Sequence, residues 1–207
     1  LCICSLTQTG HCCIFKKQKM DIPLTLEALT KIAKEYSTSG VDGIAPSSMT
    51  PGIVKEVRNM LKEEKKELIP IMSYSTKFAS NFYGPFREAA DSAPQFGDRR
   101  EYQLDVRSRK SAISSSIAYA NEGADLLMVK PGLTSIDLIS EIHQLTKKPV
   151  GAYHVSGEFA SLKILDKSKL INFDKATSEV WDTFKRAGAQ YIISYAARHA
   201  KRIYFNG

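Results

Sequence analysis

The chain alternates between short apolar runs and longer segments in which apolar residues recur at helical spacing. Between Leu24 and Tyr36, for example, Leu26, Leu29 and Ile32 fall on one face of a helix. The short runs lack polar alternation, which is typical of strands buried on both faces of a parallel sheet. Strands that alternate with helices along a chain predict a parallel sheet with helical crossovers.

The pattern predicts five strands and a series of connecting helices. The strands are expected at residues 41–45, 69–73, 126–130, 150–154 and 191–195, and residue 2 has the setting of the end of a further strand. The helices are expected at residues 24–36, 53–68, 108–121, 135–145, 157–165, 174–187 and 196–205. Residues 78–106 are rich in Gly, Pro, Arg and aromatic residues, which predicts a long loop typical of an active-site lid.

One fold that alternates strands and helices in this way is the (β/α)8 TIM barrel, which has eight strands. The pattern here predicts five strands and the end of a sixth, so we expect residues 1–207 to be the carboxyl-terminal part of such a barrel and to form a single catalytic domain. The first two to three β/α units would then lie before Leu1, which is not a methionine. An open Rossmann-like sheet is the alternative, but no G-x-G-x-x-G motif begins any predicted helix.

The composition is that of an ordinary globular protein, with 43% hydrophobic and 25% charged residues. The net charge of +7 comes from scattered Lys and Arg, so it fits small carboxylate substrates at least as well as nucleic acid, and an ordinary solvated basic surface is the alternative. No apolar run approaches the ~20 residues of a membrane helix, and the amino-terminal residues do not resemble a signal peptide. We expect a cytoplasmic protein.

Two lysines follow apolar runs where parallel strands are predicted to end. Lys130 closes the run 126–129 just before a Pro-Gly pair, and Lys77 comes after the run 68–72 and four hydroxyl residues. Barrel enzymes place their chemistry at this end of their strands. If both amines face one pocket, burial and the neighbouring positive charge disfavour the ammonium form, so that one amine is nucleophilic at about pH 7. The alternative is that each amine reaches the solvent.

The four cysteines all lie within the first 13 residues. Cys2, Cys4 and Cys12 place three thiols in one loop, and thiolates suit zinc with a fourth position left open. Three buried free thiols fit the same pattern, because cysteine is also an ordinary core residue. Cys13 is not assigned as a ligand, and His11 is a candidate for a supporting contact or a weak extra ligand.

Five blocks of sequence resemble the porphobilinogen synthase (5-aminolaevulinate dehydratase) family. They occur in that family's order and spacing, over about residues 1 to 195. Several long blocks in register are much more specific than one short motif. The blocks are Met72–Ser80, Phe82–Arg87, Phe96–Arg100, Met128–Gly132 and Tyr153–Ala160.

The resemblance implies a TIM barrel of the class I aldolase type and a hydro-lyase of tetrapyrrole (haem) biosynthesis. Such an enzyme condenses two molecules of 5-aminolaevulinate into porphobilinogen with loss of two waters. Lys130 would form a Schiff base with the first substrate, and Lys77 with the second. A catalytic zinc of the family's zinc-cysteine type would be held by Cys2, Cys4 and Cys12.

The resemblance also implies how the substrate carboxylates are bound. Arg87, Arg99 and Gln103 correspond to residues that hold one substrate, and Ser156 and Tyr195 to residues that hold the other. Guanidinium groups suit this role because they pair with a carboxylate through two parallel hydrogen bonds. The partners implied are this small-molecule substrate and further copies of the chain, since full-length family members assemble as homo-octamers; no nucleic acid or membrane is implied.

Two departures from the family pattern stand out. An acidic residue usual in the family is replaced by Ser48, which puts a local network of hydrogen bonds in doubt. Ser115 and Ala118 occupy the positions of a regulatory magnesium glutamate or its arginine replacement, so no allosteric Mg²⁺ is expected.

The rival functions are another class I Schiff-base lyase of aldolase type, or an inactive fragment that acts only in assembly.

Overall fold

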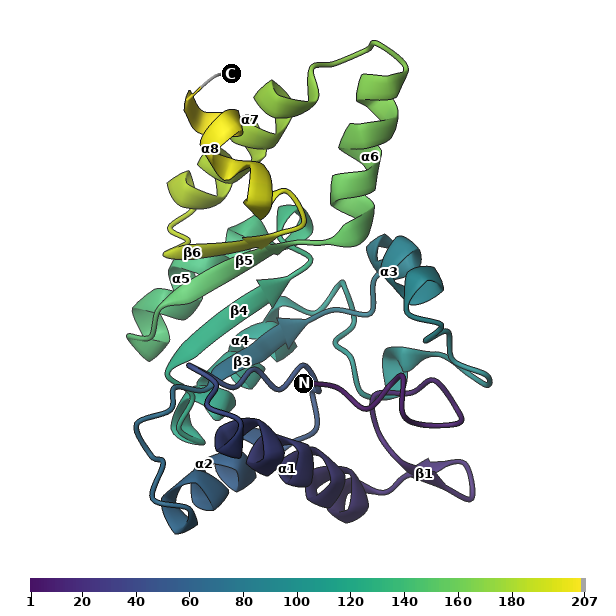
Figure 1. Ribbon diagram of the computed structural model, residues 1–207, viewed down its shortest axis with the longest axis vertical. Helices are drawn as coiled ribbons and strands as arrows, with labels where there is room; N and C mark the ends of the chain where they lie inside the picture. Colours follow the sequence, from purple (N-terminus) through teal and green to yellow (C-terminus); the bar gives the residue numbers. More distant parts are fainter. Residues whose placement is uncertain (206–207) are drawn as a thin grey trace.

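A parallel sheet forms the centre of the computed structural model, which describes residues 1–205 (Figure 1). An isolated parallel bridge between Ile44 and Ile71 extends the sheet beyond its first strand. Next to this extension, the backbone N–H of Ser47 donates to the carbonyl of Leu1 at 2.9 Å. The sheet order is β3 (Met72–Lys77), β4 (Leu126–Lys130), β5 (Val150–His154) and β6 (Tyr191–Ser194), all parallel.

Helices connect the strands and cover the sheet. In chain order they are α1 (Ile22–Thr38), α2 (Ile53–Glu63), α3 (Gly84–Ala89), α4 (Arg109–Asn121), α5 (Ile136–Thr146), α6 (Ser156–Lys167), α7 (Phe173–Arg186) and α8 (Ala200–Phe205). In Figure 1, α1 and α2 lie together below the sheet, and α6, α7 and α8 lie above it. The predicted alternation of strands and helices, and with it the parallel α/β class, is confirmed.

Two predicted boundaries are wrong for local reasons. The helix predicted to run to residue 68 ends at Glu63, because Lys65 has a φ of 56°, outside the helical region. The strand predicted at residues 69–73 is displaced, since β3 runs from Met72 to Lys77. Two of its buried hydroxyls have partners: Ser75 Oγ donates to the carbonyl of Met128 at 3.5 Å, and Thr76 Oγ1 lies 2.8 Å from Ser116 Oγ of α4.

The expected loop after the cysteines contains a small antiparallel hairpin, β1 (Phe15–Lys16) and β2 (Lys19–Met20). Its two turn residues, Lys17 and Gln18, both have positive φ, which is the backbone of a tight hairpin turn usually made by Asn or Gly. Without those residues the sequence carries no signal for a turn. The strand expected at residues 41–45 is reduced to the single bridge at Ile44.

The apolar core lies between the sheet and its outer helices. Leu127 and Val129 of β4 and Ile139 of α5 are fully buried in it. On the next strands, Gly151 leaves room for the ring of Tyr191, whose hydroxyl donates to the carbonyl of Leu127 at 2.6 Å. This packing fixes the relative positions of β4, β5 and β6, and thus of the residues at their carboxyl ends.

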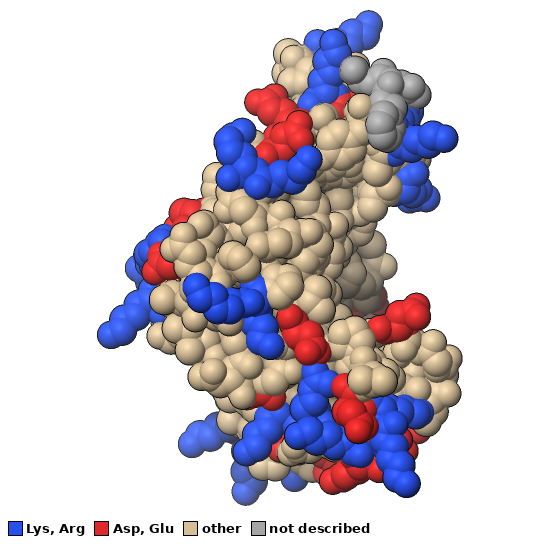
Figure 2. Space-filling view, turned by 90° about the vertical axis from the view of Figure 1, so that its left-hand side faces the viewer, with Lys and Arg blue, Asp and Glu red and all other residues tan. Residues whose placement is uncertain are grey.

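Figure 2 shows the face that looks to the left in Figure 1. Lys, Arg, Asp and Glu crowd together at its lower end, and an area without charged side chains lies above its centre. Among the helices within residues 1–205, none combines the length and the hydropathy that crossing a bilayer requires.

Candidate active site

Lys77 and Lys130 are the last residues of neighbouring parallel strands and are paired in register. Parallel strands end at the same edge of a sheet, so the two amines emerge side by side. The Lys77 side chain is buried, with 5% of the residue exposed, and its Nζ donates to the carbonyl of Ser47 at 2.8 Å. The expectation that both lysines face one pocket is therefore met by the geometry.

The two lysines line one cavity of about 200 Å³. Its walls come from the amino-terminal cysteine loop, from β3, β4 and β5, and from the long segment 78–106, which are widely separated in sequence. The lining residues are Cys2, Cys4, Cys12, Ser47, Tyr74, Lys77, Tyr83, Phe86, Arg99, Lys130 and Tyr153. The fold thus brings the cysteines, the lysines and an arginine of the predicted lid to one place.

Three tyrosine rings surround the amine of Lys130. Its Nζ lies 4.3 Å from the ring centre of Tyr153, 5.0 Å from that of Tyr83 and 5.1 Å from that of Tyr74. Burial, and after it the positive charge of Lys77, lowers the pKa of Lys130 to about 7. The ring faces attract the ammonium and oppose this shift, but burial prevails. Lys130 therefore holds a substantial neutral fraction at neutral pH.

The sequence did not single out these tyrosines. Tyr74 and Tyr153 lie within β3 and β5, where tyrosine is an ordinary strand residue. One signal for a place at the site was available, since each tyrosine lies close to the carboxyl end of its strand. Only the pairing of the strands shows that their rings meet, with centroids 6.3 Å apart.

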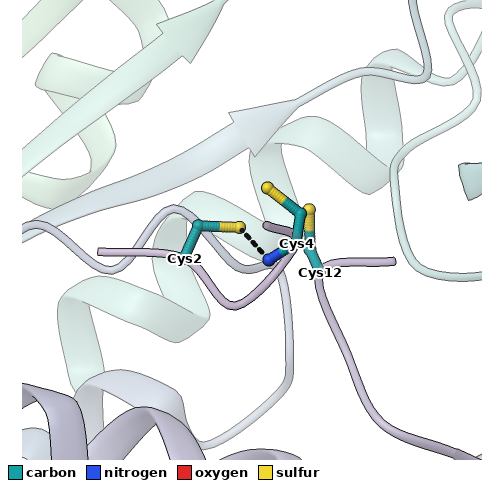
Figure 3. Close-up of side chains that lie close together, drawn as sticks. All are labelled: Cys2, Cys4 and Cys12. Atoms are coloured by element: carbon teal, nitrogen blue, oxygen red, sulfur yellow. Dashed lines mark hydrogen bonds between the residues drawn. The ribbon is translucent and has the colours of Figure 1, made fainter. Parts of the chain in front are cut away.

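The thiols of Cys2, Cys4 and Cys12 form a compact cluster, in which every sulfur lies within 4.8 Å of the others. Figure 3 shows the Cys2 sulfur pointing toward the other two cysteines, where it accepts a hydrogen bond from the backbone N–H of Cys4 at 3.4 Å. Hydrogen bonds from the thiols of Cys12 and Cys4 hold the pKa of Cys2 far below its usual range. Three converging sulfurs with one already favouring the thiolate fit a thiophilic metal such as zinc.

Cys13 lies outside this cluster. Its side chain is fully buried, and burial raises its pKa to about 12. A thiol in this state is a poor metal ligand. The structure thus separates the fourth cysteine from the three candidate ligands, as the sequence interpretation did.

His11 connects the cysteine loop to the segment 78–106. Its Nε2 donates to the carbonyl of Phe96 at 3.0 Å, and its Nδ1 lies 2.9 Å from the hydroxyl of Tyr102. The Tyr102 hydroxyl also accepts from the backbone N–H of Cys12 at 3.2 Å. Both ring nitrogens of His11 are therefore engaged by the predicted lid, which favours a supporting role over that of a metal ligand.

Arg99 makes a second connection between the same two segments. One of its guanidinium nitrogens donates to the carbonyl of Gly10 at 2.8 Å and to that of Ser92 at 2.5 Å. The approach is close at Gly10, where a Cβ would lie 2.3 Å from the carbonyl oxygen of Ala93. Arg99 thus lines the lysine cavity while it is held in place by the cysteine loop.

The other predicted substrate-binding residues are distributed around this cavity. The guanidinium of Arg87 lies 5.5 Å from the ring centre of Tyr83, which lines the cavity wall. The ring of Tyr195 stacks on that of Tyr153 at 6.3 Å between centroids. Gln103 instead lines a separate cavity of about 440 Å³, so the structure does not bring it to the lysines.

Ser156 begins α6 and contacts the start of the segment 78–106. Its hydroxyl donates to the carbonyl of Phe82 at 3.3 Å and accepts from the backbone N–H of Phe86 at 3.2 Å. Phe86 itself lines the lysine cavity. The serine predicted to bind a carboxylate therefore also makes hydrogen bonds to the first residues of the predicted lid.

Three residues assigned to a carboxylate have polar atoms without a partner within residues 1–205. These are Nε of Arg87, Nε of Arg99 and both side-chain amide atoms of Gln103. Buried donors of this kind are costly when nothing accepts from them. The unused Nε–H donors of Arg87 and Arg99 suit an anionic ligand, whereas the Gln103 amide lines the separate cavity.

Ser48, which replaces the acidic residue usual in the family, makes hydrogen bonds with a neighbouring residue. Ser48 and Thr50 are both buried, and their hydroxyl oxygens are 2.7 Å apart. The Ser48 hydroxyl also accepts from the backbone N–H of Thr50 at 3.2 Å. A hydrogen-bonded pair of hydroxyls thus lies at the position where the family pattern has an acidic residue.

Comparison with known proteins agrees with this geometry. Residues 1–203 match the family described as Delta-aminolevulinic acid dehydratase. Proteins named delta-aminolevulinic acid dehydratase from Helicobacter pylori and from Archaeoglobus fulgidus are 45% and 42% identical to the chain, and each alignment covers 98% of the chain and 62% of the relative.

A solved structure agrees over the same region. It is the crystal structure of delta-aminolevulinic acid dehydratase (porphobilinogen synthase) from Toxoplasma gondii ME49 in complex with the reaction product porphobilinogen. The TM-score is 0.94 at 38% identity, over 97% of this chain and 58% of that one. The present chain thus spans about three fifths of the length of the relatives it matches.

Proposed function

The chain belongs to the delta-aminolevulinic acid dehydratase family, and on that premise we propose that it is a porphobilinogen synthase. The reaction is the condensation of two 5-aminolaevulinate molecules into porphobilinogen with loss of two waters, a step of tetrapyrrole biosynthesis. The observation that carries the proposal is the pairing of Lys77 and Lys130 at one strand edge, in a cavity shared with three cysteine thiols.

Lys130 binds the first substrate as a Schiff base. Its pKa of about 7 leaves a neutral amine whose nitrogen adds to the ketone carbon, and the ketone oxygen departs as water. Lys77 binds the second substrate in the same way, and loss of a proton next to that imine gives an enamine carbon nucleophile. The two amines start from paired positions on neighbouring strands, and both lie near the ring of Tyr74, 5.1 Å from its centre for Lys130 and 5.8 Å for Lys77.

Arginine side chains orient the substrates through their carboxylates. Arg87 and Arg99, with Gln103, hold one carboxylate, and their unpartnered polar atoms support this assignment. Ser156 and Tyr195 hold the other. Gln103 faces a different cavity in this arrangement, so its role requires movement of the segment 78–106, which we propose acts as the active-site lid.

Cys2, Cys4 and Cys12 would hold one catalytic Zn²⁺ per active site. When bound, the zinc would supply a Lewis acid able to polarise the second substrate. The three thiols lie in the wall of the lysine cavity, so a metal that they held would border the space in which the substrates react. No regulatory Mg²⁺ is expected, because Ser115 and Ala118 carry no carboxylate and the Ser115 hydroxyl already donates to the carbonyl of Ser75 at 2.7 Å.

We also propose the wider architecture that the family implies. The described sheet corresponds to part of a (β/α)8 barrel of class I aldolase type, with further β/α units needed to close it. Residues 1–207 belong to one catalytic domain. The assembled enzyme is a homo-oligomer, an octamer as in full-length family members.

Trapping with sodium borohydride tests the function directly. Hydride reduces an imine to a stable secondary amine, so incubation with 5-aminolaevulinate and borohydride should add substrate mass to Lys130 and Lys77. Peptide mass mapping identifies the modified lysines. Modification of Lys130→Ala protein at Lys77 alone would agree with the assignment, whereas label confined to other lysines would contradict it.

A further inference from the structure

The carboxyl group of Glu158 bridges the turns that follow two neighbouring strands. Glu158 lies in the first turn of α6 and is only 1% exposed. One of its oxygens accepts from the backbone N–H of Leu133 at 2.8 Å, and the other accepts from that of Val155 at 2.8 Å. Leu133 follows β4 and Lys130, while Val155 follows β5. The side chain therefore ties the exits of β4 and β5 together.

The turn that Glu158 holds is also the turn that carries Lys130. Lys130 is separated from Leu133 by only two residues, and the second of these, Gly132, donates its N–H to the carbonyl of Tyr153 at 2.7 Å. A Cβ at Gly132 would lie 2.6 Å from the ring of Phe184. The turn is thus packed on one side and hydrogen-bonded on the other, which leaves the lysine stem little freedom.

The same first turn of α6 holds the base of the segment 78–106. Gly157 lies against the backbone of Phe82, since a Cβ at this position would be 2.6 Å from the Phe82 carbonyl oxygen. Ser156 makes hydrogen bonds to Phe82 and Phe86, as described above. Glu158 therefore lies between the Lys130 turn and the point where this segment is anchored.

Only backbone groups satisfy the buried carboxyl. Within residues 1–205, no ion pair includes Glu158. Burial raises its pKa to about 7, while the N–H groups of Val155, Leu133 and Gly132 favour the ionised form. A glutamine of the same shape has one accepting oxygen and one donating NH₂ group, so it leaves one of these two backbone N–H groups without an acceptor.

We propose that Glu158 is a positioning residue for Lys130: it fixes the turn after β4 to the start of α6 and thereby aims the Lys130 amine into the cavity. It does not touch the substrate and acts only through the backbone. This inference rests on the proposed Schiff-base function. A misplacement of about 1 Å at a reacting group lowers its reactivity by up to ~100-fold, so a small change in this turn has a measurable effect.

The test compares Lys130 with Lys77 in one protein. Glu158→Gln protein is incubated with 5-aminolaevulinate and borohydride, and the label on each lysine is measured by peptide mass mapping over time. We expect the initial rate at Lys130 to fall about tenfold or more, with the rate at Lys77 within about twofold of that in the unaltered protein. Lys77 serves as the internal standard, because no hydrogen bond of Glu158 reaches β3.

Asp125→Asn is the matched control. Asp125 accepts from the backbone N–H of Ile71 at 2.7 Å and pairs with Arg58 at 2.5 Å, at the opposite end of β4. This substitution also removes a carboxylate that tethers two strands, so it measures the effect of lost stability alone. We expect it to lower the melting temperature and leave the ratio of Lys130 label to Lys77 label unchanged.

Each result decides a different point. An unchanged label ratio in Glu158→Gln protein, or an equal shift in Asp125→Asn protein, would overturn the positioning role while the proposed function stands. Unaltered protein that takes no label at either lysine would overturn the proposed function and the inference with it. A fall confined to Lys130 in the Glu158 variant supports both.

Discussion

Lys77 and Lys130 are register partners on β3 and β4, and their amines lie 5.8 and 5.1 Å from the ring centre of the same tyrosine, Tyr74. This relationship sets the electrostatics of the site. Burial is the main cause of the low pKa of Lys130, and the positive charge of Lys77 is the next largest. Burial also keeps solvent from screening the two charges.

The first prediction concerns pH. In the proposed function the neutral Lys130 amine is the reactive form, so the rate of Schiff-base formation at Lys130 should rise as pH increases through about 7 and then level off. Lys77→Met removes the neighbouring positive charge, raises the pKa of Lys130 and should move the midpoint to higher pH. The measurement is the initial rate of borohydride-trapped label on Lys130 as a function of pH. The control is Lys163→Met, at a lysine of α6 whose Nζ lies over the ring of Phe173, and it should leave the midpoint in place.

The second prediction concerns the metal. Purified protein should contain about one zinc per chain, held by three thiolates. Cys4→Ser should remove most of this zinc, whereas Cys13→Ser should retain it because Cys13 lies outside the sulfur cluster. Metal content is measured by mass spectrometry of the intact and acid-digested protein. Equal zinc in the two variants would contradict the assignment of ligands.

The third prediction concerns the contact between the cysteine loop and the predicted lid. His11→Phe keeps an aromatic ring next to Phe15 and Phe96 but removes both hydrogen bonds. We expect the free energy of unfolding to fall by about 1–3 kcal/mol. Limited proteolysis should cut within residues 92–103 more rapidly.

The control for this variant is His143→Phe, which removes the hydrogen bond from a ring nitrogen of α5 to the Lys148 carbonyl, outside the cysteine loop and the segment 78–106. It should lower stability without faster cleavage of the lid segment. Equal cleavage of the two variants would show that His11 stabilises the protein as a whole and not this contact.

The fourth prediction concerns the close approach of β5 and β6. A Cβ at Gly151 would lie 2.2 Å from the ring of Tyr191, so Gly151→Ala should displace this ring and weaken its hydrogen bond to Leu127. Overpacking of this kind costs about 1–3 kcal/mol, measurable by denaturant unfolding. Gly84→Ala has nothing within 4 Å of the added Cβ and should change stability little. Similar losses in both variants would contradict the packing argument.

The sequence by itself determined the class of fold and singled out the candidate reactive residues. Hydrophobic periodicity is a local property, so the alternation of strands and helices and the setting of Lys130 could be predicted from it. The cysteine spacing indicated three thiols in one loop and left Cys13 aside, which the sulfur cluster reproduces.

Only the tertiary structure decided what surrounds these residues. The tyrosines around Lys130 come from β3, β5 and the segment 78–106, and their meeting depends on strand register, which no local pattern encodes. The hairpin at Lys17 and Gln18 was missed because its turn lacks Gly or Asn. The carboxyl of Glu158 finds its partners in two turns that only the packing of α6 brings together. Contacts between distant segments follow from close packing in three dimensions, and a linear pattern does not contain that information.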